Sequence, residues 1–200
     1  MNKLCMDFNL ELPSWCKDYM SQYPDIIESI EDRMKLIIDL SRLNIRHNTG
    51  GPFAAGVFES NSGKIIAVGV NRVMPTNCSS AHAEIMALSL AQKRLGVYDL
   101  GGENLPEHDF FVNWLPCTMC YGATIWSGIK RLVITGQGKE LEEITGFDEG
   151  PRPDDWEGEL NKRGIKVINN VLREEAVNVY KEFRDNNNFV YNARLGNNNC

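Results

Sequence analysis

The stretch that decides the fold is "PCTMCYGATIWSG", residues 116–128, which follows the apolar run "DFFVNW", residues 109–114. The run is rich in aromatic and β-branched residues, as buried strands are. Pro116 suits the first turn of a helix, so Cys117 and Cys120 are expected on one face at the start of a helix. The positive end of that helix favours the thiolate form of both cysteines. This strand-to-helix junction is therefore predicted to carry thiolate chemistry.

Cys117 and Cys120 alone allow two kinds of chemistry, because a CxxC pair serves either redox exchange or metal binding. Upstream, "SSAHAEIMALSLAQKRLG", residues 79–96, predicts a second helix with a stripe of small and apolar residues on one side. Ser79 or Ser80 is the candidate cap for its start. The tripeptide "HAE" then falls in the first turn of this helix.

His82 and Glu84 lie two residues apart, and in the middle of a helix such side chains point to nearly opposite sides. At the start of a helix, both side chains can reach past the first turn into one site. The imidazole and the thiolates of Cys117 and Cys120 would make a three-ligand zinc site with an open fourth position, as catalytic zinc has. Glu84, which is not needed as a ligand, is the candidate proton carrier. The joint pattern favours catalytic zinc over a redox pair.

The remaining sequence alternates strands and helices. A helix is predicted over residues 25–45, and a hairpin follows, in which "FAAGVFES" and "KIIAVGVNRV" flank the turn "NSG". Further strands and helices are predicted at residues 131–136, 139–145, 156–163, 164–170 and 172–187. Such alternation indicates βαβ units. We expect an α/β fold: a three-layer α/β/α sandwich with a mixed sheet of about five strands.

Composition and the two ends of the chain narrow the class of protein. Residues 1–24 contain two prolines and are expected to form an N-terminal arm, with residues 25–200 as the domain. The 21 basic and 27 acidic residues give a net charge of -6, which argues against a nucleic-acid partner. No leader pattern and no long apolar run stand out, and the cysteines lack the spacing of a disulfide scaffold. We expect a cytoplasmic protein with a small-molecule ligand and no membrane partner.

The motifs together resemble a known family. "HAE" followed by "PCTMC" is the H-x-E…P-C-x-x-C arrangement of zinc-dependent nucleobase deaminases, and residues 25–194 resemble the cytidine deaminase superfamily. Within it, "GGPFAAGVF", "VGVNRV" and "GFDEG" are similar to the bacterial type of guanine deaminase. The resemblance implies a cytidine deaminase-like fold, a Zn²⁺ cofactor and hydrolysis of guanine to xanthine and ammonia. It also implies a homodimer in which an exchanged C-terminal segment reaches the partner's active site.

The resemblance implies a role for each residue of the metal motif. His82, Cys117 and Cys120 match the zinc ligands of the family, and Glu84 matches its proton shuttle. Zinc lowers the pKa of a bound water, and Glu84 would carry the proton of that water to a ring nitrogen of the base.

The resemblance also implies four residues around the base. Asn71 matches an amide that hydrogen-bonds the base, and Phe53 matches an aromatic residue beside the ring. Glu149 takes the place of a second carboxylate that helps to remove the amino group, and Tyr191 is the candidate for the contact with the partner's site. Simpler interpretations remain open. Asn71 could satisfy a turn, Phe53 could belong to the core, Glu149 could be a solvated charge, and Tyr191 could be structural.

Leu115 departs from the family, which usually has glutamate before the Pro-Cys pair. The missing carboxylate is neither a ligand nor the shuttle, but its loss removes a charge beside the thiolates. Guanosine, cytosine or an aminotriazine such as ammeline therefore stays open as the substrate, and adenosine in transfer RNA is a weaker alternative because of the acidic charge. A zinc-binding module without turnover and a redox CxxC protein are the alternatives from other classes.

The sequence also predicts the environments of two histidines and two tryptophans. His47 and His108 lie in loop-like sequence and are expected to be solvated. Trp114 and Trp126 are expected to pack beneath the site.

Overall fold

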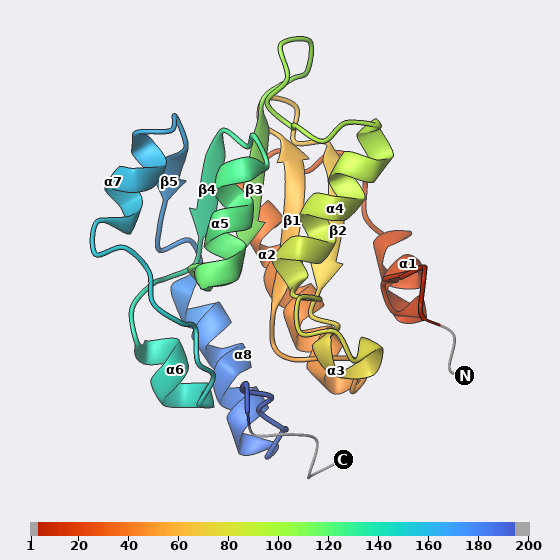
Figure 1. The fold of residues 1–200 in the computed structure, drawn as a ribbon, viewed down its shortest axis with the longest axis vertical. Coiled ribbons are helices and arrows are strands. Elements are labelled where there is room, and N and C mark those ends of the chain that lie inside the picture. The colour runs from red at the N-terminus through yellow and green to blue at the C-terminus, as the bar shows by residue number, and fades with distance from the viewer. Residues whose placement is uncertain (1–3, 195–200) are drawn as a thin grey trace.

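The computed structural model describes residues 4–194, and a five-stranded sheet forms its centre (Figure 1). The strand order is β2-β1-β3-β4-β5. Strand β1 pairs antiparallel with both β2 and β3, whereas β3, β4 and β5 run parallel. The strands are β1 (Ala54–Glu59), β2 (Ile65–Val70), β3 (His108–Val112), β4 (Arg131–Ile134) and β5 (Lys166–Ile168). The predicted mixed sheet is confirmed.

Helices cover both faces of the sheet. Helix α4 packs on β1 and β2 and contacts α5, whereas α2 packs on β1 and β3 from the other side and contacts α8. In Figure 1, α4 and α5 lie in front of the sheet and α2 lies behind it. The helices are α1 (Ser14–Met20), α2 (Ile30–Arg46), α3 (Val73–Thr76), α4 (Ala83–Leu95), α5 (Thr118–Trp126), α6 (Glu140–Thr145), α7 (Trp156–Asn161) and α8 (Arg173–Asp185). Among the described residues, no helix is long and apolar enough to cross a membrane.

Helix α2 begins later in the chain than the sequence predicted. The Ser29 hydroxyl accepts a hydrogen bond from the Asp32 amide at 3.0 Å, so the helix begins at Ile30 rather than near residue 25. Met34 and Ile37, one turn apart on the side of α2 that faces the core, are fully buried. Side-chain capping, rather than the apolar pattern, sets the start of this helix.

The start of α4 differs from the prediction in a way that shapes the site. Ser79 and Ser80 lie in a turn in which the Ala81 amide donates to the Cys78 carbonyl at 3.0 Å, and neither serine caps the helix. His82 is the N-cap residue, with extended backbone angles and no side-chain cap bond. Its imidazole is therefore available for another role at the mouth of the helix.

The N-terminal segment contains a helix that the sequence analysis did not predict. In α1, Cys16 is buried and the Trp15 ring stacks on His47 at 5.2 Å between centroids. The Trp15 indole also donates to the Thr49 hydroxyl at 2.9 Å. His47 is nevertheless exposed, as expected of a solvated side chain, although the Trp15 ring covers one of its faces. The division into an arm and a domain stays a prediction, and residues 1–3 and 195–200 lie outside the described part.

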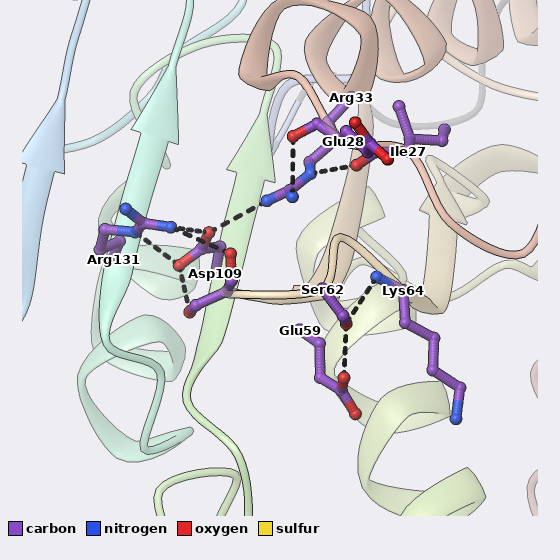
Figure 2. A network of polar contacts seen from close by, with 9 residues as sticks. Ile27, Glu28, Arg33, Glu59, Ser62, Lys64, Asp109 and Arg131 are labelled. Carbon is purple, nitrogen blue, oxygen red and sulfur yellow. Dashed lines mark hydrogen bonds and ion pairs between the residues drawn. The ribbon is translucent and has the colours of Figure 1, made fainter.

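A buried ionic network fastens the sheet to α2 (Figure 2). Asp109 in β3 is fully buried and accepts hydrogen bonds from the guanidinium groups of Arg33 at 3.4 Å and Arg131 at 2.7 Å. The Ser60 hydroxyl donates to the same carboxylate at 2.6 Å. Arg33 is itself 3% exposed, so its charge depends on this partner for compensation.

Asp109→Ala should lower the free energy of unfolding by roughly 3–5 kcal/mol, because it leaves Arg33 as a buried charge without its carboxylate. Urea unfolding followed by circular dichroism measures the change. Lys35→Ala, which removes an exposed pair with Asp39, is the control and should cost less than about 1 kcal/mol. A loss for Asp109→Ala no larger than that of the control would contradict this account.

Candidate active site

The mouths of α4 and α5 bring three metal-binding side chains together. The ligand atoms of His82, Cys117 and Cys120 all lie within 4.8 Å of one another. The Cys117 sulfur is 3.6 Å from Nδ1 of His82, and both cysteines are buried. One imidazole and two thiols are donors that zinc prefers, and three protein ligands leave a fourth tetrahedral position open. The donor set therefore fits a catalytic zinc ion.

The charges of these groups are coupled. A hydrogen bond from Cys120 and the neighbouring His82 lower the pKa of Cys117 to about 4, against the opposing effect of burial. Burial lowers the pKa of His82, but its hydrogen bond to Cys117 and the charge of Glu84 outweigh this effect and raise it to about 9. The hydrogen bond to Cys117, together with burial, holds the pKa of Cys120 well above its usual range. Cys117 is thus already a thiolate at neutral pH, the form that binds metal.

Glu84 stands beside this cluster in the first turn of α4. Its side chain is buried, with 6% exposure. Burial, followed by the nearby Cys117 thiolate, raises the pKa of Glu84 to about 7. A carboxyl group with a pKa near neutrality can both accept and donate a proton, which suits a general acid–base.

A small cavity adjoins the metal-binding cluster. Its volume is about 20 Å³, and it is lined by Phe53, His82, Glu84, Val112, Trp114, Leu115 and Glu149. Burial and the charges of Cys117 and Glu84 raise the pKa of Glu149 to about 8. Leu115, which stands where the family usually has glutamate, is 3% exposed and contributes an apolar wall. Glu149 thus lies at the cavity rather than on a solvated loop.

Two buried polar atoms without partners lie beside Gly51. The amide oxygen of Asn71 accepts from the Gly51 amide at 3.4 Å and from the Val73 amide at 3.2 Å, but its Nδ2 has no hydrogen-bond partner among the described residues. The Tyr191 hydroxyl is likewise buried without a well-aligned hydrogen bond among the described residues, although the Asn71 amide lies near enough to oppose the rise in its pKa that burial causes. A Cβ on Gly51 would lie 2.7 Å from this hydroxyl. Unpartnered buried polar groups are costly, so a ligand that pairs with them would relieve that cost.

The aromatic residues differ in part from expectation. Phe53 packs edge-on against Phe147 with 5.2 Å between ring centroids, and Tyr191 also packs against Phe147, at 4.9 Å. The sequence analysis missed Phe147, although it lies in the "GFDEG" motif. Trp114 lines the cavity as expected, but Trp126 is 86% exposed and does not pack beneath the site.

His108 was also misassigned, because it begins β3 rather than a loop. It is 1% exposed, and its Nδ1 lies 2.8 Å from the Leu100 carbonyl oxygen. The sequence offered no apolar alternation that would have shown this burial.

The family follows from a sequence match and agrees with the geometry. The sequence model of the cytidine and deoxycytidylate deaminase zinc-binding region matches residues 27–136, more than half of the chain. The chain belongs to this family of zinc-dependent deaminases. The predicted fold, enzyme class and zinc cofactor are confirmed, whereas the roles of the individual site residues stay predictions.

Known structures and sequences resemble the chain to different extents. A guanine deaminase from Nitrosomonas europaea is 42% identical, with a TM-score of 0.85, over 92% of this chain and 100% of that one. The structure of NE0047 in complex with 2,6-diaminopurine is 45% identical, with a TM-score of 0.85, over 93% of this chain and 97% of that one. A tRNA-specific adenosine deaminase from Buchnera aphidicola is 35% identical over 126 residues, 63% of this chain and 76% of that protein.

Cys120→Ser should abolish stoichiometric zinc binding, because it removes one of the three converging donors. Elemental analysis of protein purified with zinc measures the metal content. Cys78→Ser changes a cysteine outside the cluster and should retain one zinc ion per chain. Equal zinc content in the two variants would show that Cys120 is not a ligand.

Proposed function

We propose that the chain hydrolyses guanine to xanthine and ammonia. One observation carries the proposal: two carboxyl groups with raised pKa values, Glu84 and Glu149, line one cavity with His82 of the metal-binding cluster. Deamination by water needs one proton of the water moved to the ring and the other delivered to the leaving amino group as the added hydroxyl becomes a carbonyl. Two poised carboxyl groups meet both needs. The similarity to the Nitrosomonas guanine deaminase over nearly the whole chain supports guanine as the base.

Each residue of the site has its own role in the proposed reaction. His82, Cys117 and Cys120 would hold zinc, which when bound acts as a Lewis acid and lowers the pKa of water to near 7. The Glu84 carboxylate accepts a proton from the attacking water and delivers it to a ring nitrogen of the base. Glu149 supplies a proton to the amino group that leaves as ammonia. Water adds and ammonia leaves, so the reaction needs no redox partner.

Recognition of the base uses the groups beside Gly51. The free Nδ2 of Asn71 can donate to an acceptor on the edge of the base, and the Tyr191 hydroxyl can pair with a further edge atom. Phe53 lies against the cavity and can cover the ring. A base that satisfies buried donors is preferred strongly over one that leaves them unpaired.

The size of the cavity favours a small ligand and requires movement. A volume of about 20 Å³ holds little more than one water molecule, so a base enters only when a neighbouring segment shifts. A second cavity of about 470 Å³ lies on another side of His82 and is lined partly by α3 and by C-terminal residues including Tyr191. Because C-terminal residues line this second cavity beside His82, we propose that the C-terminal segment is the part that moves. A free base fits this closed arrangement better than a nucleotide within an RNA strand.

Glu84→Gln should bind zinc normally and lower kcat for guanine by at least about 10²-fold, because the amide cannot carry a proton. Ammonia release from guanine, measured together with zinc content, checks both parts. Normal turnover by this variant would show that Glu84 is not the proton shuttle. It would also exclude the alternative of a zinc-binding module without turnover.

Glu149→Gln should also slow guanine turnover by at least about tenfold, because an amide cannot protonate the leaving amino group. The same ammonia assay measures it, with Asp148→Asn as the matched control. Asp148 is the exposed neighbour, and its substitution should have a much smaller effect. Equal rates in the two variants would show that Glu149 does not protonate the leaving amino group.

We further propose that the enzyme is a homodimer. The outer face of α5 is apolar, and no residue within 4–194 covers it: Met119 is 39% exposed, Trp126 is 86% exposed, and a Cβ on Gly122 would meet no atom of that range within 4 Å. Clustered exposed apolar residues are typical of protein interfaces.

The C-terminal segment bears on how such a dimer would form. In the single chain, Tyr191 contacts Phe147 of its own site, and an exchanged dimer would make the same contact between subunits. The exchange of the C-terminal segment stays a prediction.

Mixing two inactive variants tests the exchange. Tyr191→Ala keeps Glu84 but weakens the C-terminal contact, whereas Glu84→Gln keeps the contact but lacks the shuttle. If the segment is exchanged, co-refolded mixtures contain one complete site per mixed dimer and recover activity well above that of either variant. Mixed dimers, verified with two affinity tags, that stay inactive would show that each segment serves its own subunit.

A further inference from the structure

The loop at residues 146–152, which carries Glu149, is fastened to the start of α5. The Thr118 amide donates to the Glu149 carbonyl at 3.0 Å, and the Thr118 hydroxyl contacts the same carbonyl at 3.3 Å. The hydroxyl also donates to the Pro151 carbonyl. From the loop side, the Arg152 guanidinium donates to the Pro116 carbonyl at 3.2 Å. Contacts from both sides thus join the loop to the turn that holds the metal-binding cysteines.

Gly150 allows the close approach of the two segments. Its φ is +68°, a conformation that residues with a Cβ rarely adopt. A Cβ there would lie 2.8 Å from the Thr118 hydroxyl oxygen, so a larger residue would push the loop away. Conformation and space both require glycine at this position.

The backbone of Glu149 is held at both ends. Its carbonyl accepts from Thr118, and its amide donates to the Glu142 carboxylate at 3.2 Å. A peptide unit fixed in this way limits where the side chain can lie. The position of the Glu149 carboxyl at the cavity therefore depends on Thr118, although Thr118 itself is exposed and is not a lining residue of the cavity.

We infer that Thr118 and Arg152 are positioning residues of the deamination, which hold the 146–152 loop so that the Glu149 carboxyl stays at the reacting amino group. The inference rests on the proposed function of Glu149. It assigns a task to Thr118, one of the two residues between the cysteines, which have no ligand role of their own. A small displacement of a catalytic group is enough to slow a reaction by orders of magnitude.

Thr118→Val removes the hydroxyl and keeps the shape of the side chain. It should lower kcat for guanine by about tenfold, the effect of roughly one hydrogen bond, with KM changed less than about threefold. Thr118→Ser retains the hydroxyl and should recover most of the lost rate. Zinc content and melting temperature, measured on the same samples, should be those of the wild type. A wild-type kcat for Thr118→Val, or an equal loss for Thr118→Ser, would overturn the inference.

Gly150→Ala disturbs the same contact from the loop side. Because both changes release one loop, the double variant Thr118→Val/Gly150→Ala should lose less kcat than the product of the two single losses. Losses that multiply fully would show that the residues act independently and would overturn the inference.

Hydrogen–deuterium exchange separates failure of this inference from failure of the proposed function. In Thr118→Val, amides of residues 147–152 should exchange several-fold faster than in the wild type, whereas Thr118→Ser should show no such increase. If the wild type releases no ammonia from guanine while the exchange rises, the guanine assignment fails and the fastening of the loop stands. Unchanged exchange in Thr118→Val would overturn the fastening itself.

Discussion

Helices α4 and α5 begin at the same edge of the sheet, and the chemistry of the site depends on the proximity of their N-termini. Strands β2 and β3 flank β1 and are both antiparallel to it, so they point the same way and end at the same edge. Neighbouring strands lie about 4.8 Å apart, and the segments that follow β2 and β3 therefore emerge within about 10 Å of each other. One leads to His82 and the other to Cys117. The sheet topology thus places the imidazole beside the thiolate before any metal binds.

This convergence also creates the electrostatic character of the site. Burial, and after it the Cys117 thiolate, raises the pKa values of both Glu84 and Glu149, so both carboxyl groups can hold protons near neutral pH. A divalent cation at the cluster would oppose the effect of the thiolate and favour ionised carboxylates. The same three donors that would hold zinc therefore tune the two carboxyl groups that we propose to move protons. Leu115, which stands where the family usually has glutamate, is uncharged. The electrostatic balance of the site therefore depends on Glu84 and Glu149.

Residues with local signals were predicted well from the sequence. The strands and helices followed apolar periodicity, and "HAE" and "PCTMC" indicated the cluster because each begins a helix. The prediction failed where tertiary contacts decide: a turn displaced the expected serine caps of α4, and His108 is buried at the start of β3 rather than solvated in a loop. Trp126 was expected to pack beneath the site, yet it is 86% exposed. Phe147 lies in the loop at residues 146–152, and Thr118 contacts the same loop. These contacts join segments that are distant in the sequence, so no local sequence pattern could reveal the role of either residue.

The most direct test of the account is ammonia release by the purified zinc-loaded enzyme from guanine, guanosine, cytosine, adenine and ammeline, compared at equal concentration. The account predicts release from guanine at a kcat/KM at least about tenfold above that for every other compound, because only the preferred base pairs with the buried groups beside Gly51. Faster release from another compound would contradict the assignment of guanine while keeping the zinc chemistry. No release from any of the five would contradict the account of this protein as a working nucleobase deaminase.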